Sequence, residues 1–85
     1  MTGPDAPQAL SVIIEAAAAI ADERPDAETN ATAAGWDSLD MIELAASLGE
    51  RLDVICTFED VFDAANLGAL AQVLADRVAA DRPSP

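Results

Sequence analysis

The clearest hydrophobic pattern lies in the first quarter of the chain. Apolar residues there recur at intervals of three or four, at Leu10, Ile13, Ile14, Ala17 and Ile20. This spacing places side chains along one face of an α-helix. Pro25 interrupts the pattern, because proline and the residue before it resist the helical backbone. The sequence therefore predicts a first helix that ends before Pro25.

A long polar connection follows, over about residues 22–36. It is acidic at first and rich in Ala and Thr later. Loops of this length in compact domains are often functional. A loop that simply packs across the molecule is the alternative, and the sequence leaves both interpretations open.

The second helix is expected to begin at Asp37, whose carboxylate can accept a hydrogen bond from a first-turn N–H group. Asp40 follows three residues later, in the position of the capping-box partner. Ile42 and Ala46 are expected at the edge of the core, partly exposed. The leucines expected to line the apolar face are Leu39, Leu44, Leu48 and Leu52, and the acids expected to face water are Asp40, Glu43 and Glu50.

Two more helices are predicted in the last third of the chain. Thr57 and Asp60 repeat the capping pattern before a short helix over roughly 58–63, with Phe58, Val61 and Phe62 expected to face inward. Asn66 can cap the last helix, whose apolar stripe is Leu67, Leu70, Val73, Leu74 and Val78. The expected fold is all-α, a small four-helix bundle with three longer helices and one short third helix. One domain is expected over 8–80, between a flexible leader, 1–7, and a flexible tail, 81–85.

Composition narrows the function. The 85 residues suffice for one domain, and 4 basic against 16 acidic residues give a net charge of −12. Such a chain lacks the basic footprint of a nucleic-acid binder and is not attracted to anionic membranes. Histidine is absent, which excludes a Ser-His-Asp triad and most transition-metal sites. We expect a monomer whose partners present basic surfaces.

Two features of the sequence indicate the cellular compartment. The single cysteine cannot form an internal disulfide, which is typical of an intracellular protein. No apolar run is long enough for a transmembrane span, and the N-terminus has no basic segment of the kind that opens a signal peptide. A cytoplasmic location is therefore expected.

Ser38 is the most informative candidate site residue. It directly follows the expected cap Asp37 at the start of the second helix. Unpaired N–H groups and the positive end of the helix dipole tolerate a phosphate attached there. Physics alone also allows a simple capping role, because serine in the first turn of a helix commonly caps it.

The residues around Ser38 carry a resemblance to a known family. Gly35-Trp36-Asp37-Ser38-Leu39, followed by Glu43-Leu44 and Leu48, resembles the phosphopantetheine attachment motif of acyl carrier proteins. The resemblance implies that Ser38 is esterified by 4′-phosphopantetheine, transferred from coenzyme A by a Mg²⁺-dependent phosphopantetheinyl transferase. The thiol of this arm would hold an acyl group as a thioester, and the protein itself would be a non-catalytic carrier.

The resemblance also implies a recognition face on the second helix, formed by Asp37, Leu39, Asp40, Ile42, Glu43 and Ala46. This face would meet basic patches on the transferase and on acyl-loading, ketosynthase-type or adenylating enzymes. Trp36 departs from the pattern of general fatty-acid carriers and resembles some free-standing carriers of specialised metabolism and of aminoacyl loading. It could anchor the loop or contact the prosthetic arm.

Three functions are considered. The first is a free-standing acyl carrier of polyketide, fatty-acid or related specialised-metabolite biosynthesis. The second is a free-standing aminoacyl or peptidyl carrier loaded by an adenylating enzyme. The third is an acidic helical adaptor that carries no modification, in which Ser38→Ala would leave function intact.

Overall fold

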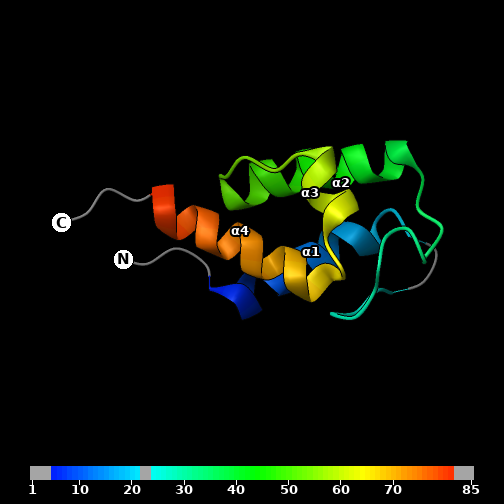
Figure 1. Cartoon of the computed structure of the whole chain (residues 1–85), viewed down its shortest axis with the longest axis horizontal. Helices are drawn as coiled ribbons and strands as arrows, with labels where there is room; N and C mark the ends of the chain where they lie inside the picture. The colour runs from blue at the N-terminus through cyan, green and yellow to red at the C-terminus, as the bar shows by residue number, and fades with distance from the viewer. Residues whose placement is uncertain (1–4, 22–23, 82–85) are drawn as a thin grey trace.

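The computed structural model describes residues 5–21 and 24–81. These residues form four helices and, within those two ranges, no strand. The helices are α1 (Ala6–Ala18), α2 (Ser38–Leu52), α3 (Phe58–Asp63) and α4 (Leu67–Asp81). α2 and α4 run along opposite sides of the bundle, α1 lies behind α4, and the short α3 crosses between α2 and α4 (Figure 1). The predicted all-α bundle with a short third helix is confirmed.

α1 begins earlier than the sequence analysis expected. The backbone N–H of Gln8 donates to Asp5 Oδ1 over 2.9 Å, and the Asp5 N–H donates to Gln8 Oε1 over 3.0 Å. Pro7 fits the first turn because that turn has no intrahelical acceptor for its missing N–H. Residues 5–7 therefore belong to the capped helix rather than to the expected leader. At the other end, α4 includes Asp81, which had been assigned to the tail; the remaining leader and tail residues lie outside the described ranges.

The core lies where α1 packs against α2 and α4, and where α2 packs against α3. Alanines at the helix contacts, such as Ala9, Ala17 and Ala71, are buried and allow close approach of the helices. The larger side chains that are fully buried are Ile13, Leu44, Leu48, Val61, Leu67, Leu70 and Leu74. The core is therefore built mainly from leucines held between alanine-lined helix faces.

Three apolar side chains that the sequence analysis placed in the core are exposed. Leu39 is 62% exposed, Phe62 51% and Val73 42%. Leu39 precedes Leu44 by five residues, so the two lie about 140° apart around the helix. Met41 precedes Leu44 by only three residues, and it takes the buried position instead. The same geometry turns Phe62 away from the buried Val61, its neighbour in the chain.

The connection before α2 packs on the start of α4. The N–H groups of Leu67 and Gly68 donate to the carbonyls of Thr29 and Ala27, over 2.9 and 2.8 Å. Asn30 Nδ2 donates to the carbonyl of Ala65 over 2.8 Å. The first N–H groups of a helix have no intrahelical acceptors, so the loop supplies them. Residues 27–30 of this connection therefore pack against the start of α4, as the packed-loop interpretation expects.

Candidate functional site

The chain turns into α2 through a glycine in the left-handed region. Gly35 has φ +83°, a conformation that favours glycine because a Cβ would be strained there. The next residue, Trp36, donates its N–H to the carbonyl of Ala31 over 3.0 Å. The glycine and this hydrogen bond close the loop immediately before the helix and fix the direction in which α2 starts.

The first turn of α2 is held by the predicted capping box. The Asp40 N–H donates to Asp37 Oδ1 over 2.8 Å, and the Asp37 N–H donates to Asp40 Oδ2 over 3.3 Å. Asp37 has an extended backbone, with φ −88° and ψ 178°, as helix caps do. The predicted capping roles of both residues are confirmed.

Ser38 is the first helical residue, and it is exposed. Its hydroxyl forms no hydrogen bond with any other residue that the structure describes. The capping role therefore belongs to Asp37, and the hydroxyl of Ser38 is presented to solvent on a fixed turn. A simple capping function does not explain this serine.

The surroundings of Ser38 suit a phosphodiester. The positive end of the α2 dipole stabilises negative charge on the helix side. The nearby carboxylates of Asp37 and Asp40 oppose it, but each already accepts a backbone N–H bond that offsets part of its charge. The exposed hydroxyl, the helix terminus and the open space around it fit a prosthetic group attached through phosphate.

The expected recognition residues divide into two groups in the structure. Leu39, Ile42, Glu43 and Ala46 are exposed and lie on one face, because their spacing of three, four and seven residues follows the helix period. Asp37 is exposed at the start of this face. Asp40 is only half-exposed, and its side chain lies in the wall of a cavity instead.

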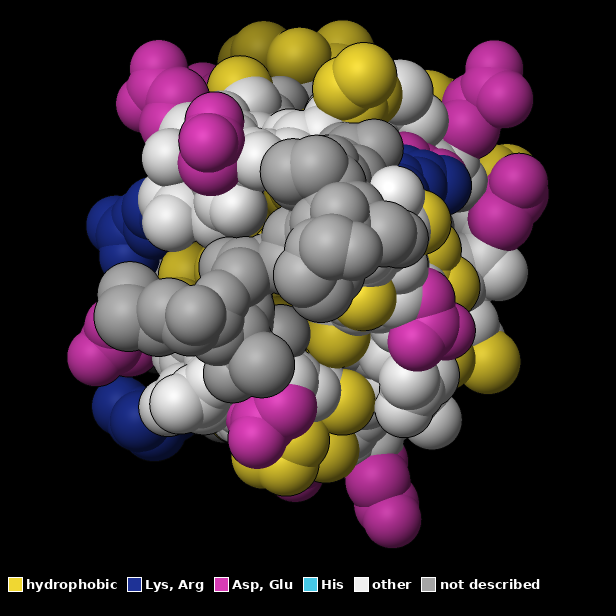
Figure 2. All heavy atoms as spheres, turned by 90° about the vertical axis from the view of Figure 1, so that its left-hand side faces the viewer, with side chains coloured by type: hydrophobic (Ala, Val, Ile, Leu, Met, Phe, Trp, Pro, Cys, Tyr) yellow, Lys and Arg dark blue, Asp and Glu magenta, His cyan; other side chains and the backbone are white. Residues whose placement is uncertain are grey.

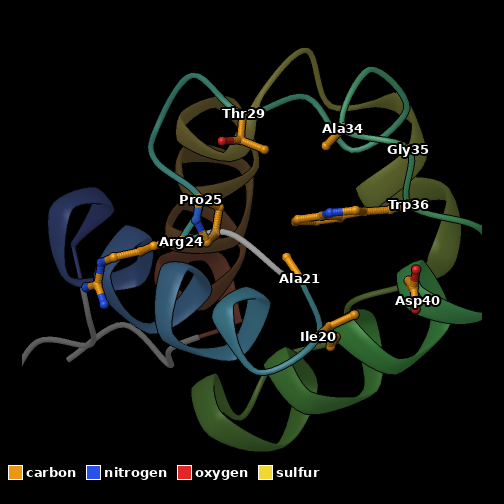
Figure 3. A pocket seen from close by; sticks show the side chains of 9 residues that line it. All are labelled: Ile20, Ala21, Arg24, Pro25, Thr29, Ala34, Gly35, Trp36 and Asp40. Carbon is orange, nitrogen blue, oxygen red and sulfur yellow. The ribbon is translucent and has the colours of Figure 1, made fainter.

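That cavity has a volume of about 470 Å³ and lies between the end of α1, the loop and the start of α2. The ring of Trp36 extends across the space, with Ala34 on one side and Ala21 on the other (Figure 3). The side chain of Arg24 points away from the centre of the space (Figure 3). The lining residues are Ile20, Ala21, Arg24, Pro25, Thr29, Ala34, Gly35, Trp36 and Asp40. The sequence did not predict this cavity, because its walls come from three separate segments.

Three large apolar side chains outside α2 are exposed although the sequence analysis did not predict it, namely Ile55, Phe62 and Val73. Ile55 is 73% exposed in the link before α3, and Phe62 is 51% exposed on α3, where its ring stacks on Phe58 with centroids 5.7 Å apart. The segment 53–56 is largely apolar, but its composition does not indicate which of its side chains face water.

Cys56 is a poor nucleophile in this fold. Burial raises the pKa of its thiol to about 11, and the nearby charge of Asp60 adds to that effect while Arg77 opposes it. The thiol therefore stays protonated at neutral pH. Within the described ranges there is also no group of three or more His, Cys, Asp or Glu side chains that could hold a metal ion.

A family model described as a phosphopantetheine attachment site matches residues 8–74, so the chain belongs to this family of carrier proteins. Its members carry covalently attached 4′-phosphopantetheine, and carrier domains of this kind are generally non-catalytic. They interact with a phosphopantetheinyl transferase and with partner enzymes. The resemblance stated from the sequence is confirmed.

Two further comparisons were negative. A search of curated proteins and a search of solved structures each returned no match. Among the helices of the described residues, none is both long and apolar enough to cross a membrane.

Proposed function

We propose that Ser38 is the residue that carries 4′-phosphopantetheine, and that the chain transports acyl groups between enzymes of polyketide, fatty-acid or related specialised-metabolite biosynthesis. The observation that supports this most directly is the exposed Ser38 hydroxyl, on a turn already capped by Asp37. The serine is thus accessible to a modifying enzyme without loss of the cap.

In this function the arm supplies a thiol that holds the acyl group as a thioester. The chain's own residues position the arm. Asp37 and Asp40 fix the first turn of α2, and Gly35 sets the direction from which the loop enters it. The high pKa of the Cys56 thiol, about 11, disfavours attack of this thiol on the thioester.

The exposed face of α2 is proposed to meet the partner enzymes. Leu39 and Ile42, which are 62% and 51% exposed respectively, form its apolar centre. Asp37 and Glu43 add negative charge beside them. A phosphopantetheinyl transferase, acyl-loading enzymes or ketosynthase-type enzymes with Arg and Lys patches would complement it. Charge complementarity of this kind raises association rates more than affinity, which suits a protein that must leave each partner again.

One end of the molecule also combines acidic and apolar side chains, with some basic side chains among them (Figure 2). Figure 2 shows the end of the molecule away from the loop, where Asp and Glu side chains project around the rim and exposed hydrophobic side chains lie between them. With a net charge of −12, the chain repels its own copies and attracts basic surfaces. We therefore also propose that it acts as a monomer.

Intact mass tests the attachment site. The purified chain is incubated with coenzyme A, Mg²⁺ and a broad-specificity phosphopantetheinyl transferase. We expect one phosphopantetheine mass increase in the unaltered chain and in Ser11→Ala, which removes an exposed serine of α1. We expect none in Ser38→Ala. A mass increase that persists in Ser38→Ala would place the arm elsewhere.

An amino acid is the alternative cargo. Trp36, directly before the Asp-Ser pair, is the sequence feature that favours this reading over a general fatty-acid carrier. Separate loading reactions decide between an acyl cargo and an amino-acid cargo. Transfer of malonyl or other acyl groups to the thiol supports an acyl carrier, whereas ATP-dependent loading by an adenylating enzyme supports an aminoacyl or peptidyl carrier.

A further inference from the structure

The short helix α3 carries an apolar row on its surface. Phe58 and Phe62 are four residues apart and therefore lie on one face of the helix, where their rings stack with centroids 5.7 Å apart. Phe58 is half-buried and packs against the core, whereas Phe62 is exposed. Ile55, in the link three residues before Phe58, is exposed as well. These three residues, Ile55, Phe58 and Phe62, are called the α3 patch.

An acidic row runs beside the apolar one. Glu59 and Asp63 each follow a phenylalanine of the α3 patch by one residue, which places them about 100° farther around the helix. Both side chains are exposed. Asp53, two residues before Ile55, adds a third exposed carboxylate in the link. The α3 patch is thus an apolar surface with acidic side chains along its edge.

Contacts on the other sides of α3 fix the position of Phe62. Asp60 accepts hydrogen bonds of 2.6 and 2.9 Å from Arg77 of α4. Val61 is buried in the core, and the ring of Phe58 supports that of Phe62 from within the same helix. An exposed aromatic ring that is already ordered loses little conformational entropy on binding, so it is well suited to anchor an interface.

We propose that the α3 patch is a docking surface for a partner protein whose apolar pocket accepts Phe62 and whose Arg and Lys side chains meet Glu59 and Asp63. This surface belongs to a different helix from the face of α2 that the proposed function uses. A partner that presents basic side chains alone cannot bury the apolar row, so the α3 patch selects among basic partners by their apolar surface. The inference does not depend on a prosthetic group at Ser38.

The charges of the chain decide against two other occupants. A two-fold interface places the same surface on both sides, so a second copy of this chain would bring the two acidic rows together. The net charge of −12 adds to that repulsion. An anionic membrane is repelled for the same reason. A protein surface that is both apolar and basic complements the two rows.

A synthetic peptide tests the proposal. The probe is an amphipathic helical peptide with leucines along one face and arginines on both sides of them, and the control peptide has serines in place of the leucines. Because α2 also exposes apolar side chains, binding is measured by calorimetry in a variant that carries Leu39→Gln and Ile42→Gln. At an ionic strength of about 0.15 M, we expect this variant to bind the leucine peptide about tenfold more tightly than the serine peptide.

Two further substitutions in that variant locate the site. Phe62→Gln removes the anchoring ring and should raise the Kd of the leucine peptide about tenfold. Val73→Gln removes an exposed apolar side chain of α4 and should leave the Kd nearly unchanged. Circular dichroism verifies that each variant is folded. In proton–nitrogen NMR spectra of the unaltered chain, the leucine peptide should move the amide signals of Glu59 and Phe62 more than that of Ser11.

The contrary outcomes are equally definite. Equal affinity for the two peptides, or a Kd that Phe62→Gln leaves unchanged, overturns the proposal. A dimer of the unaltered chain that Phe62→Gln dissociates in analytical ultracentrifugation also overturns it, because the occupant is then a second copy. Ser38→Ala should bind the leucine peptide as the unaltered chain does. The attachment proposal, which intact mass tests, can therefore fail while the docking surface stands, and the reverse also holds.

Discussion

At the start of α2, Asp37 and Ser38 have separate roles. Asp37 caps the helix through its hydrogen bond with the Asp40 N–H, and Ser38 presents a hydroxyl that takes no part in capping. Asp37 also adds negative charge beside the proposed attachment site. Its contribution to stability and its contribution to recognition can be separated, because asparagine caps helices about as well as aspartate but carries no charge.

Substitution at Asp37 tests this separation. Asp37→Ala should lower the free energy of unfolding by about 1 kcal/mol, because the cap is lost. Asp37→Asn should leave stability nearly unchanged and slow modification by the transferase at low salt. Urea denaturation followed by circular dichroism measures the first effect, and intact mass against time measures the second. Equal modification rates for Asp37→Asn and the unaltered chain would remove Asp37 from the recognition face.

Among the helices, α3 depends on one side chain of α4. Arg77 Nη1 donates to Asp60 Oδ2 over 2.6 Å and to the carbonyl of Ile55 over 2.9 Å, while Nη2 donates to Asp60 Oδ1 over 2.9 Å. Asp60 also accepts the N–H of Thr57 and so completes the capping box of α3. A helix of six residues is too short to be stable alone, so these bonds help to fix its position.

The carboxylate of Asp60 also makes the free energy of unfolding depend on pH. The hydrogen bonds from Arg77 are the main reason why the pKa of Asp60 falls to about 2. An aspartate in the unfolded chain titrates near 3.9. Because the folded-state pKa is the lower one, the stabilisation is complete above about pH 4 and is lost as the pH falls through about 2.

As the pH falls from about 4 to 2, the free energy of unfolding should therefore decrease less in Asp60→Asn than in the unaltered chain. Urea midpoints at several pH values in this range measure the difference. Asp63→Asn, which removes an exposed carboxyl of the same helix, serves as the matched control and should keep the acid dependence of the unaltered chain. An acid dependence of Asp60→Asn equal to that of the control would contradict the assigned role of Arg77.

For the molecule as a whole, the charge of −12 opposes folding as it assists recognition. Like charges on 85 residues repel one another more strongly in the compact state than in the unfolded one. Salt screens this repulsion, with a Debye length of about 10 Å at 0.1 M ionic strength. The charge that attracts basic partners is thus expected to lower stability in dilute buffer.

Added KCl should therefore raise the melting temperature, and MgCl₂ at equal ionic strength should raise it at least as much. Equal increases indicate screening, whereas a larger increase with MgCl₂ indicates binding of the ion. Thermal denaturation followed by circular dichroism measures both. A melting temperature indifferent to both salts would contradict the account.

Local chemistry explains why much of the fold could be predicted. The caps at Asp37, Thr57 and Asn66 depend on residues within one turn, and all three lie where the sequence indicated. The cap at Asp5 was not predicted, because residues 1–7 were expected to form a flexible leader, whereas proline at position 7 is tolerated in the first turn of a helix.

Burial was harder to predict, because it depends on what lies opposite each helix. Leu39 and Phe62 are as apolar as the core residues, yet no other helix covers them. Met41 is buried because it shares the face of Leu44 and Leu48. Hydrophobicity alone therefore did not separate core residues from those of the exposed face.

The sequence by itself determined the four helices, the excess of acidic residues and the motif around Ser38 that resembles an attachment site, since each depends on composition or on residues close together in the chain. The tertiary structure alone decided which apolar side chains remain exposed, and it brought the end of α1, the loop and Trp36 together around a cavity. It also joined Arg77 to Asp60 across 17 residues. Contacts between segments far apart in the chain depend on how the helices pack, which no local pattern specifies.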